Sequence, residues 1–68
     1  MSKFIPLTWR LSKKEETPTL VNVATISNIA IHEKGTRIFF NFSVSGMQYF
    51  ITVKEDYETV QNLLENLT

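Results

Sequence analysis

Two stretches of alternating apolar and polar residues, 36–44 and 47–53, dominate the hydrophobic pattern and predict a β-hairpin. Ser45 and Gly46 lie between them as a two-residue turn, in which glycine readily takes the positive φ that such turns need. With this turn, every pair that faces across one side of the hairpin is apolar. The pairs are Val44–Met47, Phe42–Tyr49, Phe40–Ile51 and Ile38–Val53.

A second hairpin is predicted upstream, where residues 27–33 form a strand and Lys34-Gly35 forms its turn. This turn places Ile31 opposite Ile38 and Ile29 opposite Phe40. The two turns are assigned independently, yet they make the same face apolar across three strands. Because a one-residue slip would move every side chain to the other face, this agreement supports the predicted faces.

The N-terminal part predicts two further strands, at residues 4–11 and 19–23. Pro6 has no N–H to donate, so we expect the first strand to lie at a sheet edge at that point. The polar residues 12–18 between them predict a loop or wide hairpin turn. A bend or a single helical turn is expected before Ile26.

The pattern changes to helical spacing over residues 56–67, with Asp56 as the N-cap. Its apolar stripe consists of Tyr57, Val60, Leu63, Leu64 and Leu67. A helix this short is marginal alone, so it should pack on the apolar sheet face. We expect it to contact Phe40, Phe42, Tyr49 and Ile51. The prediction is a single α+β domain over residues 1–68, with a bent antiparallel sheet of about five short strands and one C-terminal helix. An SH3-like or barrel-like curl is the main variant.

Composition narrows the function classes. The 68 residues include no cysteine and one histidine, which excludes disulfides and the usual zinc-ligand sets. No apolar run is long enough to span a membrane, and residues 1–6 do not resemble a secretory signal, so we expect a cytoplasmic protein without a membrane partner. His32 and Asp56 are interpreted as a surface residue and a helix cap. Without a catalytic motif, we predict no enzyme activity and no cofactor.

Four residues stand out on the opposite face of the predicted hairpin: Arg37, Phe39, Asn41 and Phe50. One interpretation is that the sheet curls and Trp9 covers the two Phe rings as a second core layer. The second is an interaction surface for a protein partner or for a second copy of the chain, as in a homodimer. The third is stacking of nucleic-acid bases, which the balanced charge of seven basic and seven acidic residues does not favour.

Four segments resemble the small FlbD-type flagellar proteins, and equally a group of short bacterial and phage proteins with the same layout. They are Ile5-Pro6-Leu7-Thr8-Trp9-Arg10-Leu11, Val21-Asn22 with Ile26 following, Gly35-Thr36-Arg37-Ile38, and Val53-Lys54-Glu55. The resemblance covers most of the chain and brings no catalytic residues with it. It implies a small regulatory or accessory protein of bacterial or phage origin that is not an enzyme.

Overall fold

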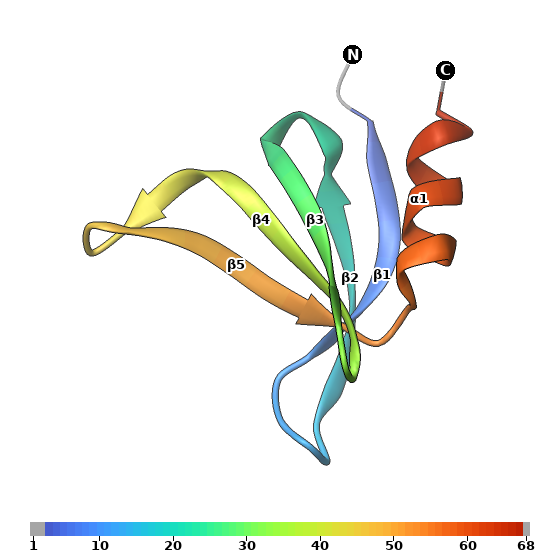
Figure 1. Ribbon diagram of the computed structural model, residues 1–68, viewed down its shortest axis with the longest axis horizontal. Helices are drawn as coiled ribbons and strands as arrows, with labels where there is room; N and C mark the ends of the chain where they lie inside the picture. The colour runs from blue at the N-terminus through green and yellow to red at the C-terminus, as the bar shows by residue number, and fades with distance from the viewer. Residues whose placement is uncertain (1–2, 68) are drawn as a thin grey trace.

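The computed structural model describes residues 3–67, which form five strands, one 3-10 turn and one helix (Figure 1). The elements in chain order are β1 (Phe4–Arg10), β2 (Glu16–Asn22), η1 (Val23–Thr25), β3 (Ile26–His32), β4 (Gly35–Val44), β5 (Met47–Val53) and α1 (Tyr57–Glu65). The α+β class and the helical turn before Ile26 are confirmed. The second strand begins at Glu16, three residues before its predicted start, and Pro18 lies within it. This position suits proline because β2 is an edge strand.

The strands form one antiparallel sheet in the order β2-β1-β5-β4-β3. Over residues 3–67 no ladder joins the edge strands β2 and β3, so the sheet is not closed and the SH3-like or barrel-like variant is not confirmed. β1 pairs with β2 along its length but with β5 only where Trp9 faces Val53. At Pro6, β1 therefore has a strand neighbour on one side only, as its missing N–H predicts.

Hydrogen bonds beside that single pair complete the junction between β1 and β5, which we call the seam. The Lys54 N–H donates to the Thr8 carbonyl at 2.9 Å. The Glu55 carboxylate accepts from the Thr8 backbone N–H and from its hydroxyl, each at 2.9 Å. The fully buried Thr36 hydroxyl donates to the Glu55 carbonyl at 2.8 Å. A side chain thus takes the place of ladder bonds where the two halves of the sheet diverge.

The core lies on the concave side of the sheet, between the strands and α1. Its buried apolar residues come from four strands and the helix, and they are Ile5, Leu7, Val21, Ile38, Phe40, Ile51, Val53 and Val60. Trp9, Tyr49, Leu63, Leu64 and Leu67 pack against them. Of the eight predicted core residues on β4 and β5, four are buried, and they lie toward the end of the hairpin that meets the seam.

The turn at Ser45 and Gly46 is confirmed, and both residues have positive φ, as a type I′ turn requires. The predicted register holds near the turn, where Val44 faces Met47, but not beyond it. Between the pairs Ser43–Gln48 and Phe39–Phe50, β4 has three residues against only Tyr49 on β5. This bulge shifts the register by two residues, so Ile38 faces Ile51 and not Val53.

The turn between β3 and β4 is Glu33-Lys34, so the predicted Lys34-Gly35 turn is wrong by one residue. Gly35 is instead the first residue of β4, where it faces His32. A Cβ on Gly35 would lie 2.0 Å from the Val53 carbonyl oxygen, and its φ is +143°. Glycine is therefore required by the close approach of β5. Because the turn lies one residue earlier than predicted, Ile29 faces Ile38 and not Phe40.

The helix is shorter than predicted, at Tyr57–Glu65, and begins at the predicted N-cap. The Thr59 N–H donates to the Asp56 carboxylate at 2.9 Å. The side chain and then the backbone N–H of Thr59 hold the pKa of Asp56 below its usual value. The helix contacts β3 and β4 and buries Val60, but it does not cover Phe42, which is exposed. That part of the predicted packing is wrong because the hairpin beyond the bulge extends away from α1 (Figure 1).

Candidate functional site

The outer face of the sheet, opposite the core, carries a pair of aromatic rings. Because of the register shift, Phe39 on β4 lies directly opposite Phe50 on β5, and not diagonal to it as the predicted turn implied. Their ring centroids are 5.5 Å apart, with the planes tilted by 43°. Phe50 is 43% exposed and Phe39 is half-buried. Such cross-strand aromatic pairs stabilise a sheet, yet this pair also presents ring surface to the outside.

Arg37 completes the array, since it lies two residues before Phe39 on the same face of β4. Its guanidinium carbon is 4.8 Å from the centroid of the Phe50 ring. A cation at this distance from a ring is attracted by about 0.5–1 kcal/mol at an exposed site. Its Nε is enclosed and makes no hydrogen bond with residues 3–67. The guanidinium group thus lies against an aromatic ring, and its Nε has no carboxylate partner in this part of the chain.

Asn41 does not join this array, although the sequence placed it on the same face. It lies in the bulge, and its side-chain amide donates to the Ala24 carbonyl at 3.0 Å. A second side chain serves the bulge in the same way, because the Gln48 amide donates to the Phe40 carbonyl at 3.1 Å. Asn41 is thus explained by local structure, and the candidate site is reduced to Arg37, Phe39 and Phe50.

Trp9 lies on the core side of the sheet. It packs against the core cluster and shares a groove with Phe40, Tyr49 and Ile51. The interpretation in which Trp9 covers the outer Phe rings as a second core layer is therefore wrong. The reason is the alternation of β1, which puts Ile5, Leu7 and Trp9 on one face, with Trp9 opposite the buried Val53.

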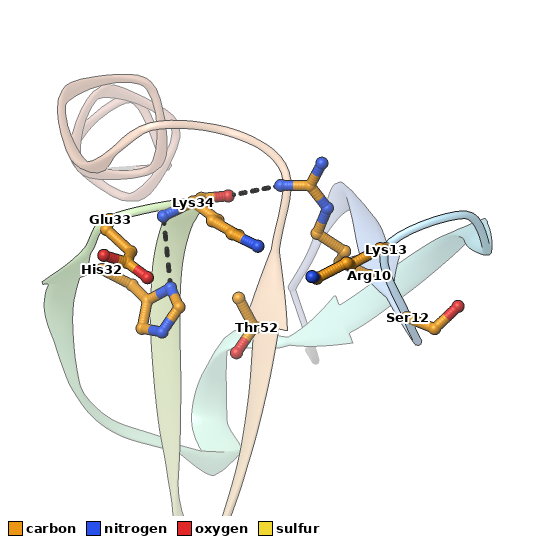
Figure 2. A pocket seen from close by; sticks show the side chains of 7 residues that line it. All are labelled: Arg10, Ser12, Lys13, His32, Glu33, Lys34 and Thr52. Carbon is orange, nitrogen blue, oxygen red and sulfur yellow. Dashed lines mark hydrogen bonds between the residues drawn. The ribbon is translucent and has the colours of Figure 1, made fainter.

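A cleft of about 630 Å³ adjoins the aromatic array through Thr52, the residue directly opposite Arg37 (Figure 2). Figure 2 shows Arg10, Ser12 and Lys13 on one side of Thr52 and His32, Glu33 and Lys34 on the other. The Arg10 guanidinium donates to the Lys34 carbonyl at 2.8 Å, which joins the two sides. The Lys34 N–H in turn donates to His32 Nδ1 at 3.3 Å.

The cleft is basic, with three cationic side chains against the single carboxylate of Glu33. Arg10 also faces Glu16 at its rim, where Nε and Oε2 are 3.5 Å apart. The lysine ammonium groups take part in no salt bridge with the cleft acid over residues 3–67. Together with Arg37, the cleft and the aromatic array form one continuous outer surface, which we call the outer site: Arg37, Phe39, Phe50, Thr52, Arg10, Lys13, His32 and Lys34.

Charge is separated along the chain in a way that the neutral total conceals. Residues 3–54 carry all seven Lys and Arg but only three of the seven acids, a formal charge of +4. The segment 55–67 carries the other four acids and no base, a charge of −4. The sheet is therefore the basic part of the molecule and the helix the acidic part. A comparison of charge between segments of the sequence would have found this signal, which the net charge missed.

No three His, Asp or Glu side chains among residues 3–67 come together as metal ligands would. No helix in this range has the length and apolar character needed to cross a membrane. No protein-family model, no curated protein and no solved structure matches this chain.

Proposed function

We propose that this protein is a non-catalytic interaction module that binds another protein through the outer site. The observation that carries the proposal is the array of Arg37 over Phe50 with Phe39 beside it, on a sheet face that α1 leaves uncovered. Aromatic residues and arginine are the residue types enriched in the energetically dominant centres of protein interfaces. An accessory or regulatory role in the cytoplasm of a bacterium or in a phage-infected cell agrees with the family resemblance.

The chemistry of the outer site favours an acidic partner segment. Arg37 and the cleft cations lie at one end of the two rings, so a bound chain would meet an apolar patch with a basic margin on that side. Arg10 is tied to the Lys34 carbonyl and to Glu16 at the rim, which pre-orders the margin and leaves Lys13 and Lys34 as its main cationic groups. Charges at such a margin raise the association rate and select the partner more than they add affinity.

Photo-crosslinking in the organism that encodes the protein tests this proposal. We would replace Phe50 by p-benzoylphenylalanine, which keeps an aromatic ring at the position, and irradiate living cells. Phe4 is the matched control, because it is a similarly exposed Phe on β1 that lies away from the array. We expect a protease-sensitive adduct from position 50 that is absent from position 4. Equal adducts from both positions, or none from position 50, would contradict the proposal.

Single-stranded nucleic acid is the second candidate, favoured by the basic cleft beside the rings. Bases can stack on exposed aromatics while lysines neutralise phosphates. The same crosslinking distinguishes it, because the adduct would then be nuclease-sensitive. Fluorescence anisotropy of a labelled oligothymidine at low salt provides a direct test. Binding should weaken steeply with added salt, and no binding at high micromolar protein removes this candidate.

A further inference from the structure

The outer part of the β4–β5 hairpin, residues 41–48, projects beyond the core, and we call it the arm. At its base the Asn41 amide bonds to the Ala24 carbonyl and Phe42 stacks on Tyr49. Every residue of the arm is exposed, and only the pairs Ser43–Gln48 and Val44–Met47 continue the ladder beyond the bulge. Figure 1 shows it extending to the left of the view, away from α1. A two-stranded hairpin without a third strand or a helix packed on it is marginally stable in water. The arm therefore has the geometry of an element that is completed by something else.

The arm is also free of charge, which is unusual for a projecting hairpin. No charged residue occurs in the 16 residues from 38 to 53. Phe42 is 45% exposed, Met47 is 72% exposed, and Val44 is exposed beside them. Soluble proteins commonly protect projecting strands with charges or proline, because exposed apolar edges associate. The absence of both here indicates a surface that is buried by association.

The same chain also has an uncharged groove near the arm. A groove of about 180 Å³ lies on the core side at the base of the arm, between β2 and β5. None of its lining residues is charged: Trp9, Thr19, Leu20, Val21, Asn22, Phe40, Tyr49 and Ile51. An apolar cavity of about 150 Å³ can hold a benzene molecule, so this groove has room for one ring or one methionine side chain.

We propose that the protein forms a two-fold symmetric dimer in which the arm of each copy enters the groove of the other, with Met47 as the inserted side chain. Met47 is the most exposed large apolar side chain of the arm, and its flexible thioether fits irregular apolar gaps. Phe42 is less suited, because its ring is already stacked on Tyr49 at 5.4 Å and 16°. Reciprocal insertion is closed at two copies, so it yields a dimer and not a fibre.

The lack of charge favours a second copy over a partner of opposite charge. The arm and the groove are both uncharged and both present apolar side chains, so each fits the other in chemistry, whereas the charges of this chain lie elsewhere. A biological interface needs about 1,000 Å², so the arm and the groove would together bury about 500 Å² of each copy, roughly a tenth of its 4857 Å² surface. The outer site lies on the opposite face of the sheet and takes no part in this contact.

Sedimentation over a range of protein concentrations tests the proposal. The wild-type chain should sediment as a dimer of two 7.9 kDa copies. Met47→Asn should raise the dimer dissociation constant at least 100-fold, because each dimer loses two buried side chains. Thr19→Lys should act in the same direction, because Thr19 faces Leu7 on the core side of the sheet and the replacement places a charge in the groove. Ile31→Asn is the control, since Ile31 is 77% exposed at the far end of β3 and should not affect the dimer.

A mixture of two variants identifies the arm–groove contact itself. Met47→Asn retains an intact groove and Thr19→Lys an intact arm, so the mixture can form one good contact where each variant alone forms none. We expect a mixed dimer whose dissociation constant is about tenfold higher than that of the wild-type dimer, under conditions where each variant alone stays monomeric. A monomeric wild type, larger open-ended species, or a mixture no more associated than its parts would each overturn the proposal. Circular dichroism checks that each variant is folded, as expected for substitutions at the exposed Met47 and the half-buried Thr19.

Discussion

Replacing Val60 by alanine tests whether one helix side chain anchors α1 to the sheet. Val60 is the fully buried residue of α1, and the core cluster that it joins contains Ile5, Ile38 and Val53. A helix of this length does not form alone in water, so its stability depends on that contact. Because the helix is short, few other contacts can compensate when the contact of Val60 is weakened.

The magnitude follows from the two carbon atoms that the substitution removes. Their transfer from water contributes about 1.6 kcal/mol at 0.8 kcal/mol for each. The cavity that remains in a closely packed core brings the loss to about 2–3 kcal/mol. A chain of this size has a free energy of unfolding of about 3–10 kcal/mol. Val60→Ala should therefore remove at least a fifth of the stability and lower Tm by about 10–20 °C.

The measurement is thermal and urea unfolding followed by circular dichroism, at one fixed protein concentration because association would raise Tm. Gln61→Ala is the matched control, since Gln61 is the next residue and is exposed. Among residues 3–67 its side chain donates to Glu65 of the same helix, so the expected change is within about 0.5 kcal/mol. If the two variants lose the same stability, α1 does not contribute to the core through Val60 and the description of the fold is wrong.

Three further substitutions test separate features. Gly35→Ala should destabilise the protein by about 3 kcal/mol or more, because the added Cβ would meet the Val53 carbonyl at 2.0 Å; denaturant unfolding measures this, and a neutral result would contradict the close approach. Thr36→Val should cost about 1–3 kcal/mol of stability, because it leaves the Glu55 carbonyl without its 2.8 Å hydrogen-bond partner, whereas Thr36→Ser keeps that bond. Amide exchange compares the two variants, and weaker protection in the serine variant than in the valine variant would contradict this role of the hydroxyl. Asp56 has a lowered pKa in the folded state, so its contribution to stability is fully present above its ordinary pKa of 3.8 and is lost as the pH falls through the folded-state pKa. The free energy of unfolding, measured as a function of pH, should show this loss in the wild type and not in Asp56→Asn.

The faces of the sheet could be predicted although the register could not. Both register errors amount to two residues: Ile38 faces Ile51 and Ile29, in place of Val53 and Ile31. A shift of two preserves alternation, so the side chains stayed on their predicted faces. Alternation of apolar residues fixes which face a side chain occupies, but it carries no information on how far a strand slides by an even number of residues.

The bulge and Gly35 depend on contacts between segments distant in sequence. In the sequence, Asn41 resembles an ordinary outward-facing residue of a strand. Its place in the bulge is evident from the pairing of β4 with β5 and from the hydrogen bond of its side-chain amide to the Ala24 carbonyl. Gly35 resembles a turn glycine, whereas the Val53 carbonyl is what excludes a side chain there. Of the predicted site residues, Arg37, Phe39 and Phe50 were correctly grouped because they lie between the bulge and the seam, where the alternation is regular.

The seam has a consequence for how the chain folds. The β3–β4–β5 meander forms from neighbouring segments, whereas the contact between Thr8 and Glu55 requires a loop of more than forty residues to close. Closing a long loop for one ladder pair and a few side-chain bonds is entropically costly, so we expect the meander to form first. The N-terminal hairpin then docks in a later step, in which Thr8 forms its hydrogen bonds to the Glu55 carboxylate. Protection of the Thr8 amide from exchange would report when these bonds have formed.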